Sequence, residues 1–440
     1  MAFEDSKNFF KNFVFTFIRQ IGVGIISLLT TILIARFFGP EINGVFSIAI
    51  LLPILLGTFL NMGVAASNIY FIGSKQVSLE EAIHVNKIVF FWISLVGLII
   101  GSIIVFFKGE FFFPGIEQNL LFLSLIIFPI ILLSGFILSI YQALQDFKVF
   151  NILLMLQPLL FFFFVLSLII IDLKEVNFLV YGFLLTYIIS LIYMIVKIYS
   201  LPKEVNFEKT NYFKKSLGYG WRSNLSNILA FLNYKADIFL VNIFLNPTAT
   251  GVYVVAVALV EKIWLISTAL STVLLPRLSE LLSNEEEKRK ITPYISRLVF
   301  LGTFIIGVFL ALLAEPVILL IFGIEYQGSI SPLLLLLPGV IILGVAKVWA
   351  NDIAARGKPE INMYISIVTI IVNIIGNLIL IPKIGLDGAA IATTISYLVC
   401  SIMTLIVYSR YSKTSWIDSL IIKLVDINNV IEILKNRVGR

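Results

Sequence analysis

Charged side chains interrupt several long apolar runs of this sequence, and their types point to a specific chemistry. An ionisable group is costly in hydrocarbon, so it normally faces the interior of a helical bundle or a water-filled cavity. Cations in such a cavity can compensate an anionic ligand, and carboxylates can exchange a basic partner for a small cation. The residues concerned are Arg19, Arg222, Lys235, Asp237, Glu261, Lys262, Glu315, Lys347 and Asp352.

The depth of each charged residue in its apolar run indicates whether it belongs to a cavity site or only reaches the membrane interface. Arg222 and Asp352 lie within about one or two turns of a run's end, where a side chain can instead reach the membrane interface. Arg19 and Lys347 lie about two turns in, which favours a cavity role. A purely structural ion pair remains open for the deepest group. That group is Lys235, Asp237, Glu261 and Lys262.

The apolar run at 218–245 carries the most polar residues of any run. On a helix, Arg222 and Asp237 are roughly 60° apart and share a face, whereas Lys235 is turned roughly 200° from Asp237. Tyr234 shares a face with Asp237 because the two are separated by three positions. Asn224, Asn227 and Asn233 add polarity to the same run.

Two further runs combine charge with an aromatic residue or a proline. Glu261 and Lys262 adjoin each other, and Trp264 follows at an unusually deep position for a tryptophan. An indole plane near buried charge can stack on a sugar ring, and it can equally fill a core. Glu315 precedes Pro316 in the run at 296–322, where proline removes a backbone hydrogen bond and can bend the helix.

Residues for enzymatic chemistry are scarce. The only histidine, His84, lies beside glutamates outside the apolar runs, which argues against histidine-based metal or triad chemistry. No GxxxxGK[ST] phosphate loop occurs, so ATP hydrolysis by that route is excluded. The single cysteine, Cys400, excludes internal disulfides and is expected to serve packing. We expect no cofactor, no metal and no enzyme.

The composition requires a membrane to surround the chain. Hydrophobic residues make up 59% and charged residues 13% of the sequence, and the mean hydropathy is +1.03. A soluble domain carries about 25% charged residues. Runs of roughly 20 apolar residues without alternation predict membrane-spanning helices. The first run lacks a small-residue cleavage site, so we expect a retained helix and not a signal peptide.

The runs define an all-α membrane protein with about twelve transmembrane helices. The expected spans are 12–37, 45–72, 87–107, 118–142, 151–172, 177–199, 218–245, 250–273, 296–322, 330–355, 361–382 and 387–410.

A short phrase occurs twice and divides the chain into equivalent halves. Pro40, Gly44, Val45 and Phe46 recur with the same spacing as Pro247, Gly251, Val252 and Tyr253. Both copies fall in expected turns between the first two spans of a half, as in transporters built from repeats. We therefore expect two pseudo-symmetric six-helix lobes, 1–205 and 206–411, around a central cavity. Residues 412–440 mix apolar and basic residues, which fits an amphipathic surface helix or a partly ordered, solvated tail.

The distribution of basic residues predicts the orientation. Lysine and arginine gather in the loops on the side shared by the two termini, which places both termini in the cytoplasm by the positive-inside rule. The net charge of +6 is then a consequence of topology, and no nucleic-acid partner is expected. Four tryptophans lie near the expected cytoplasmic ends of spans, where tryptophans commonly form a belt at the membrane interface. They are Trp92, Trp221, Trp349 and Trp416.

At this level of detail the chain resembles the polysaccharide (O-antigen type) flippases of the multidrug, oligosaccharidyl-lipid and polysaccharide exporter superfamily. The resemblance covers residues 10–410. It is carried by Ala35 to Pro40 with Gly44, Lys235-Ala236-Asp237, Gly251-Val252-Tyr253, Phe322-Gly323 with Tyr326, Gly357-Lys358-Pro359, Asn373, Asn377, and Ile381 to Ala390.

The resemblance implies a flippase in the bacterial cytoplasmic (inner) membrane. It would move an undecaprenyl-diphosphate-linked oligosaccharide from the cytoplasmic to the outer leaflet by alternating access, in lipopolysaccharide or capsule biosynthesis. Its partners would be this lipid-linked oligosaccharide, membrane lipid, a coupling H⁺ or Na⁺ and other polysaccharide assembly proteins. Cations that could compensate the diphosphate are Arg19, Arg222, Lys235, Lys262 and Lys347. Asp237 and Glu261 would serve gating or ion coupling. Sugar contacts would come from Asn224, Asn227, Tyr234 and Trp264.

Three other functions remain as alternatives. A multidrug H⁺ or Na⁺ antiporter shares the fold, but the charges in the spans and the Gly-Leu-Asp-Gly-Ala-Ala segment favour a polysaccharide exporter. A peptidoglycan-precursor flippase typically has two further C-terminal spans, whereas this sequence continues only as a short tail. A membrane glycosyltransferase or polymerase would need a large outer loop, and all expected outer loops are short.

Overall fold

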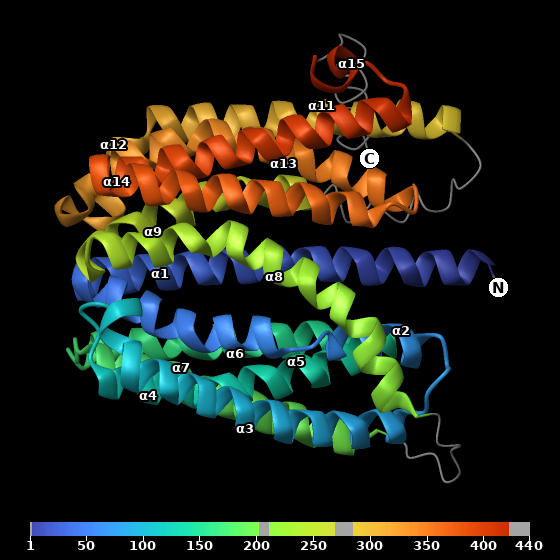
Figure 1. Ribbon diagram of the computed structural model, residues 1–440, viewed down its shortest axis with the longest axis horizontal. Coiled ribbons are helices and arrows are strands. Elements are labelled where there is room, and N and C mark those ends of the chain that lie inside the picture. Colours follow the sequence, from blue (N-terminus) through green and yellow to red (C-terminus); the bar gives the residue numbers. More distant parts are fainter. Residues whose placement is uncertain (1, 202–210, 269–284, 422–440) are drawn as a thin grey trace, which may run out of the picture. The chain divides into compact units, whose positions relative to one another are not determined.

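Nearly all of the described chain is α-helical, as expected from the sequence. The computed structural model describes residues 2–201, 211–268 and 285–421 (Figure 1). The helices preceding residue 262 are α1 (Ala2–Leu60), α2 (Val64–Gly73), α3 (Leu79–Phe112), α4 (Gln118–Leu125), α5 (Ile127–Ala143), α6 (Phe147–Ile170), α7 (Val176–Tyr199), α8 (Tyr212–Phe244) and α9 (Pro247–Glu261).

The remaining described helices begin at Glu285. They are α11 (Glu285–Leu312), α12 (Ala314–Val317), a π-helical turn (Ile318–Phe322), a 3₁₀ segment (Ile324–Ser329), α13 (Ile330–Ala355), α14 (Pro359–Ser412) and α15 (Trp416–Leu420). The predicted bend near Glu315 corresponds to the break between α11 and α12. Figure 1 shows α13 and α14 lying side by side, and α11 also packs against α13.

The expected spans fall on helices, but several of their bounds differ. The span 45–72 is divided between the end of α1 and α2, 118–142 comprises α4 and α5, and 296–322 comprises the end of α11, α12 and the π-helical turn. The helix α14 contains two spans, 361–382 and 387–410. Among the described residues, nine helices are long and apolar enough to cross a membrane. The helix α1 bends at Gly39, where φ is 80°, and α14 bends at Ile384 and Gly385. Both bends fall in expected outer turns, so each of these helices can cross a bilayer twice. The expected span 250–273 begins with α9, and its last residues lie outside the described chain.

Large apolar side chains on the helix surfaces support a membrane environment. Phe107, Ile170 and Leu312 are exposed by 71%, 82% and 76%. Water would disfavour many such exposures, whereas lipid tails accept them.

The chain divides into two compact units, Met1–Val255 and Ala256–Arg440, which we call the first and second units. In the first unit α1 packs along α6, and α2 packs against α5 and α8. In the second unit the main contacts join α13 to α14 and α11 to α13. This division reflects contacts, whereas the lobes 1–205 and 206–411 rest on the internal repeat and stay a prediction.

The two copies of the repeated phrase pack directly against each other in the first unit. A Cβ atom added at Gly44 would lie 1.7 Å from the carbonyl oxygen of Pro247. One added at Gly251 would lie 1.9 Å from the carbonyl oxygen of Pro40. The side-chain amide of Asn43 also donates a hydrogen bond of 3.0 Å to the carbonyl of Gly251. The approach is reciprocal, and only glycine leaves room for it.

A second close approach ties α8 to the start of α2. A Cβ atom at Gly63 would lie 1.9 Å from the carbonyl oxygen of Gly220. Nearby, the Tyr212 hydroxyl donates to the Asn68 amide oxygen at 2.7 Å, and its backbone N–H donates to Glu81 at 3.2 Å. These buried polar contacts fix the first turn of α8 against α2 and α3.

The tryptophan belt is confirmed only in part. Trp92, Trp221 and Trp416 are exposed by 58%, 62% and 56%, as an interfacial position requires. Trp349 is 1% exposed and stacks on Tyr408, with 6.2 Å between ring centroids. Its interfacial assignment is wrong, because its ring belongs to the packing between α13 and α14.

Candidate functional site

The most unusual charged contact lies in the second unit, between Lys347 of α13 and Trp264. The Lys347 ammonium lies 3.6 Å from the centroid of the Trp264 ring. Trp264 is 7% exposed, and its indole N–H donates to the carbonyl of Val340 at 2.9 Å. The Tyr397 ring of α14 lies 5.8 Å away, centroid to centroid. The indole is thereby held in place with one face against a cation.

The local sequence makes room for this arrangement. Gly344 lies in α13 near the indole, and a Cβ atom there would lie 2.8 Å from the Ser267 hydroxyl and 3.6 Å from Trp264. A larger residue would push against the segment that carries the tryptophan. Glycine at this position therefore lets that segment approach α13.

A carboxylate accompanies the cation. Glu261, at the end of α9, lies close enough to Lys347 to interact with it electrostatically. Glu261, Lys262 and Lys347 are all half-buried. The structure therefore brings Lys347 to the segment that carries Glu261 and Trp264, which lies about 80 positions earlier in the sequence. Each of the three residues was expected to belong to a site.

A buried polar network on α14 belongs to the same unit and was not assigned a role from the sequence. Asn373 donates to the Thr393 and Ser396 hydroxyls at 3.3 Å each, and Asn377 donates to the Asn373 side chain at 3.0 Å. Asn373 and Asn377 are 1% and 0% exposed. The signal for this network was the pair of asparagines one turn apart in an apolar run, facing hydroxyls of the next run.

Asp237 lies in the first unit and is held by the repeated phrase. Its side chain is 3% exposed, and it accepts a hydrogen bond of 2.8 Å from the Tyr253 hydroxyl. A backbone N–H, that of Ile238, donates to its other oxygen at 2.8 Å. Tyr253 is the aromatic residue of the second phrase. The expectation that this phrase forms a turn is wrong, because Pro247 to Tyr253 form the first turns of α9. Lys235 and Tyr234 are half-buried on the same helix.

Arg19 lies in α1 against α6. Its Nε donates to the Asn151 amide oxygen at 3.0 Å, and the Asn151 amide nitrogen donates to the Thr16 hydroxyl at 3.0 Å. Asn151 is completely buried, whereas Arg19 is half-buried. The neutral amide orients the guanidinium without neutralising its charge.

The asparagines of α8 and Arg222 occupy different surroundings. The Asn224 side chain is 2% exposed and donates to the carbonyl of Phe59 at 3.2 Å, so it joins α8 to α1. Asn227 is exposed. Arg222 lies within α8, but its side chain is outside the described part of the structure.

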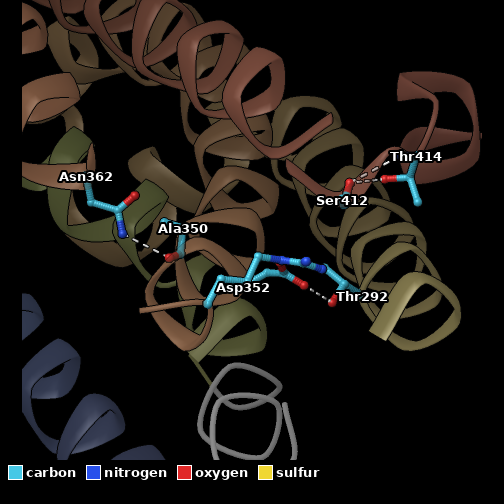
Figure 2. Close-up of polar contacts among 7 residues, drawn as sticks. Thr292, Ala350, Asp352, Asn362, Ser412 and Thr414 are labelled. Atoms are coloured by element: carbon cyan, nitrogen blue, oxygen red, sulfur yellow. Dashed lines mark hydrogen bonds and ion pairs between the residues drawn. The ribbon is translucent and has the colours of Figure 1, made fainter. Parts of the chain in front are cut away.

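Asp352 is a structural charge. It is 1% exposed and accepts a hydrogen bond of 2.6 Å from Thr292 (Figure 2). It also forms an ion pair with Arg356, which directly follows the end of α13. The alternative that it reaches the membrane interface is wrong, because α11 and α13 enclose it. Glu315, in contrast, is exposed.

No three of the histidine, cysteine, aspartate or glutamate side chains within the described ranges converge as metal ligands would. What the site offers is cations, a carboxylate and an aromatic face. Such groups can bind and release an anionic or sugar-bearing ligand, and they contain no arranged nucleophile and base.

The fold is that of multi-pass membrane transporters. A structure of the lipid II flippase MurJ in an inward closed conformation superposes with a TM-score of 0.77 and 19% identity, covering 96% of this chain and 93% of that one. An outward-facing multidrug resistance MATE family transporter gives 0.65 and 17% identity over 92% and 97% of the two chains. The chain belongs to the polysaccharide biosynthesis protein family, whose sequence model matches residues 33–331.

Curated relatives agree with this family. The probable low-salt glycan biosynthesis flippase Agl15 of Haloferax volcanii is 23% identical over 275 residues, covering 58% of this chain and 57% of the relative. The putative O-antigen transporter of Shigella flexneri is 26% identical over 201 residues, covering 45% and 47%. The matches thus span about half the length of these relatives. The resemblance derived from the sequence is confirmed.

Proposed function

We propose that this protein translocates an undecaprenyl-diphosphate-linked oligosaccharide from the cytoplasmic to the outer leaflet by alternating access. It resides in a bacterial cytoplasmic membrane with both termini in the cytoplasm, and it supplies polysaccharide assembly proteins on the outer side. Two six-helix lobes, 1–205 and 206–411, carry the movement, and residues 412–440 form a surface tail. No covalent bond is made or broken.

The contact of Lys347 with Trp264 is the observation that carries this proposal. A diphosphate cannot cross hydrocarbon unless its charge is compensated. Lys347 is retained near the membrane interior by an aromatic face and by Glu261. An arriving diphosphate competes with the indole and with Glu261 for the ammonium. The cation that compensates the diphosphate is therefore already in place when the ligand binds. Lys262, beside Glu261, adds a second cation to the same region.

The remaining candidate residues take roles consistent with their chemistry. Arg19, Arg222 and Lys235 supply further positive charge, while Asn224, Asn227, Tyr234 and Trp264 contact the sugar. Asp237 and Glu261 exchange their partners for H⁺ or Na⁺ and couple transport to an ion gradient. Trp264 has one ring face against Lys347, so a sugar would stack there only after the ammonium moves to the diphosphate.

Reconstitution tests the proposal directly. Liposomes containing the protein and a fluorescent polyprenyl-diphosphate oligosaccharide are exposed to an impermeant quencher, so that the translocated fraction is measured under imposed H⁺ or Na⁺ gradients. We expect protein-dependent translocation that Lys347→Ala and Lys262→Ala reduce. Lys148→Ala, which alters an exposed cation, is the matched control.

Two results would contradict the proposal. Lipid that stays in its starting leaflet while a cationic drug is transported would support a multidrug antiporter. Translocation that is unchanged in Asp237→Asn and Glu261→Gln, or after collapse of both gradients, would remove ion coupling while leaving the flippase intact.

A further inference from the structure

A cavity in the first unit lies apart from the charged residues discussed above. It has a volume of about 410 Å³ and lies between α3, α5 and α7. Its wall is mostly apolar and includes Phe90, Phe136 and Ile195. Pockets of this size, roughly 300–1,000 Å³, commonly hold small ligands or parts of larger ones.

The mouth of the cavity carries charges of both signs along one face of α3. Glu80, His84 and Lys87 all line it. Their spacing places them on the same side of the helix, with the carboxylate about 10 Å along the axis from the lysine. The Lys87 ammonium lies 5.4 Å from the centroid of the Tyr199 ring on α7, and Tyr199 also lines the cavity.

A buried amide adds an independent sign of a missing ligand. Asn86 lines the cavity and is 4% exposed. Neither polar atom of its side chain has a hydrogen-bond partner in the described part of the chain. Leaving such groups unpaired costs about 1–3 kcal/mol, so a ligand that bonds them would be stabilised.

The surroundings indicate that this ligand comes from the bilayer. All three helices belong to the set long and apolar enough to span a membrane, and the neighbouring Ile88 and Phe91 are exposed by 42% and 61%. An acyl chain can enter from that surface and bury itself among the apolar residues. The polar mouth then meets the headgroup.

We propose that this cavity binds a zwitterionic phospholipid of the phosphatidylethanolamine type. The phosphate contacts Lys87 and His84, the ammonium contacts the Glu80 carboxylate, and one acyl chain fills the apolar floor. Asn86 bonds to the ester or phosphate oxygens. A headgroup with both charges matches the mouth better than an anionic one, because Glu80 repels an uncompensated phosphate. The inference does not depend on the flippase function.

Photo-crosslinking in nanodiscs tests this assignment. The probe is phosphatidylethanolamine with a diazirine in one acyl chain, diluted in the uncharged bilayer lipid digalactosyldiacylglycerol, and crosslinked peptides are mapped by mass spectrometry. We expect labelling of α3, α5 and α7 near the cavity, displaced by unlabelled phosphatidylethanolamine about tenfold better than by phosphatidylglycerol, as loss of one charge-assisted bond predicts.

Two variants separate the cavity from the general lipid surface. Ile195→Trp fills the floor and should lower labelling at least about tenfold, whereas Ile88→Trp on the exposed face of α3 should not. Glu80→Gln should abolish the preference over phosphatidylglycerol while preserving the fold. This second variant keeps the test valid where Ile195→Trp fails to fold, as judged by gel filtration.

Three outcomes would overturn the proposal. Labelling equal in wild type and a folded Ile195→Trp variant would mean that no lipid occupies the cavity. Equal displacement by phosphatidylglycerol would exclude the zwitterionic headgroup. Displacement by undecaprenyl phosphate at lower concentration than by phosphatidylethanolamine would assign the cavity to the polyprenyl carrier instead.

Discussion

The ammonium of Lys347 lies against the face of the Trp264 indole, 3.6 Å from the ring centroid. The indole cannot swing away freely, because its N–H bonds to the Val340 carbonyl. Lysine, in contrast, has a flexible stem, so the cation is the mobile partner of the pair. This asymmetry suits a site in which the charge follows a ligand while the aromatic wall stays in place.

Removing the charge of Lys347 should impair transport more than it impairs folding. Lys347→Met preserves the apolar stem and loses the charge-assisted contact with the diphosphate, worth about 1.5–3 kcal/mol, so translocation in the liposome assay should fall about 10- to 150-fold. Lys347→Arg preserves the charge, and a guanidinium can also stack on an indole, so this variant should retain more activity than Lys347→Met, although the larger side chain is not an exact substitute. Wild-type rates in Lys347→Met, beside an unaffected Lys148→Met control, would remove the lysine from the site.

Adding a methyl group to the repeated glycine should destabilise the protein. Gly251→Ala forces the new Cβ into the Pro40 carbonyl, and overpacking of this kind costs about 1–3 kcal/mol. The thermal unfolding temperature of the purified protein in detergent should therefore fall. Gly135→Ala is the matched control, since a Cβ there meets nothing within 4 Å. An unchanged unfolding temperature for Gly251→Ala would contradict the close approach.

Tyr253→Phe tests the hydrogen bond to Asp237. The substitution leaves one oxygen of a buried carboxylate without this donor, which should cost about 1–3 kcal/mol. In Asp237→Asn the hydroxyl still has an oxygen acceptor, so the same tyrosine substitution should matter less in that background. A double-mutant cycle of unfolding temperatures measures this coupling, with the exposed Tyr181→Phe as control. Additive effects would show that the charge of the Asp237 carboxylate does not strengthen its hydrogen bond with Tyr253.

Arg356→Ala should be more damaging than its partly exposed position indicates. It leaves the buried Asp352 carboxylate without its ion-pair partner, and such losses cost about 3–5 kcal/mol. Chemical unfolding in mixed micelles can measure the change, with Arg410→Ala as a control at an exposed arginine. Equal stability of the two variants would mean that the pair contributes nothing.

Most of the helical framework could be predicted from the sequence, and most contacts at the site could not. Hydropathy is local, so runs of apolar residues predicted the spans, and Gly39 and Gly385 marked two turns inside continuous helices. The hydrogen-bond partners of Asp237 and Trp264 lie on other helices, Tyr253 on α9 and Val340 on α13. One sequence shows that such polar groups need partners, but it does not show which helix faces meet.

Trp349 illustrates the same limit. Its position near the end of an apolar run predicted an interfacial ring, yet the ring stacks on Tyr408 inside the second unit. Depth along a helix is readable from hydropathy, whereas the direction of a side chain around that helix depends on its neighbours. The direction in which each side chain points around its helix axis is therefore the main property that the sequence did not determine.

The reciprocal contact of Gly44 and Gly251 also constrains how this protein can evolve. Duplicated segments usually diverge independently once each has its own surroundings. Here the backbone of each copy occupies the space that a side chain on the other would need. A side chain at either glycine would collide with the backbone of the other phrase, so a substitution in one phrase requires the backbone of the other to move. Glycine is therefore needed at position 44 for as long as the Pro247 carbonyl keeps its place, and at position 251 for as long as the Pro40 carbonyl keeps its own.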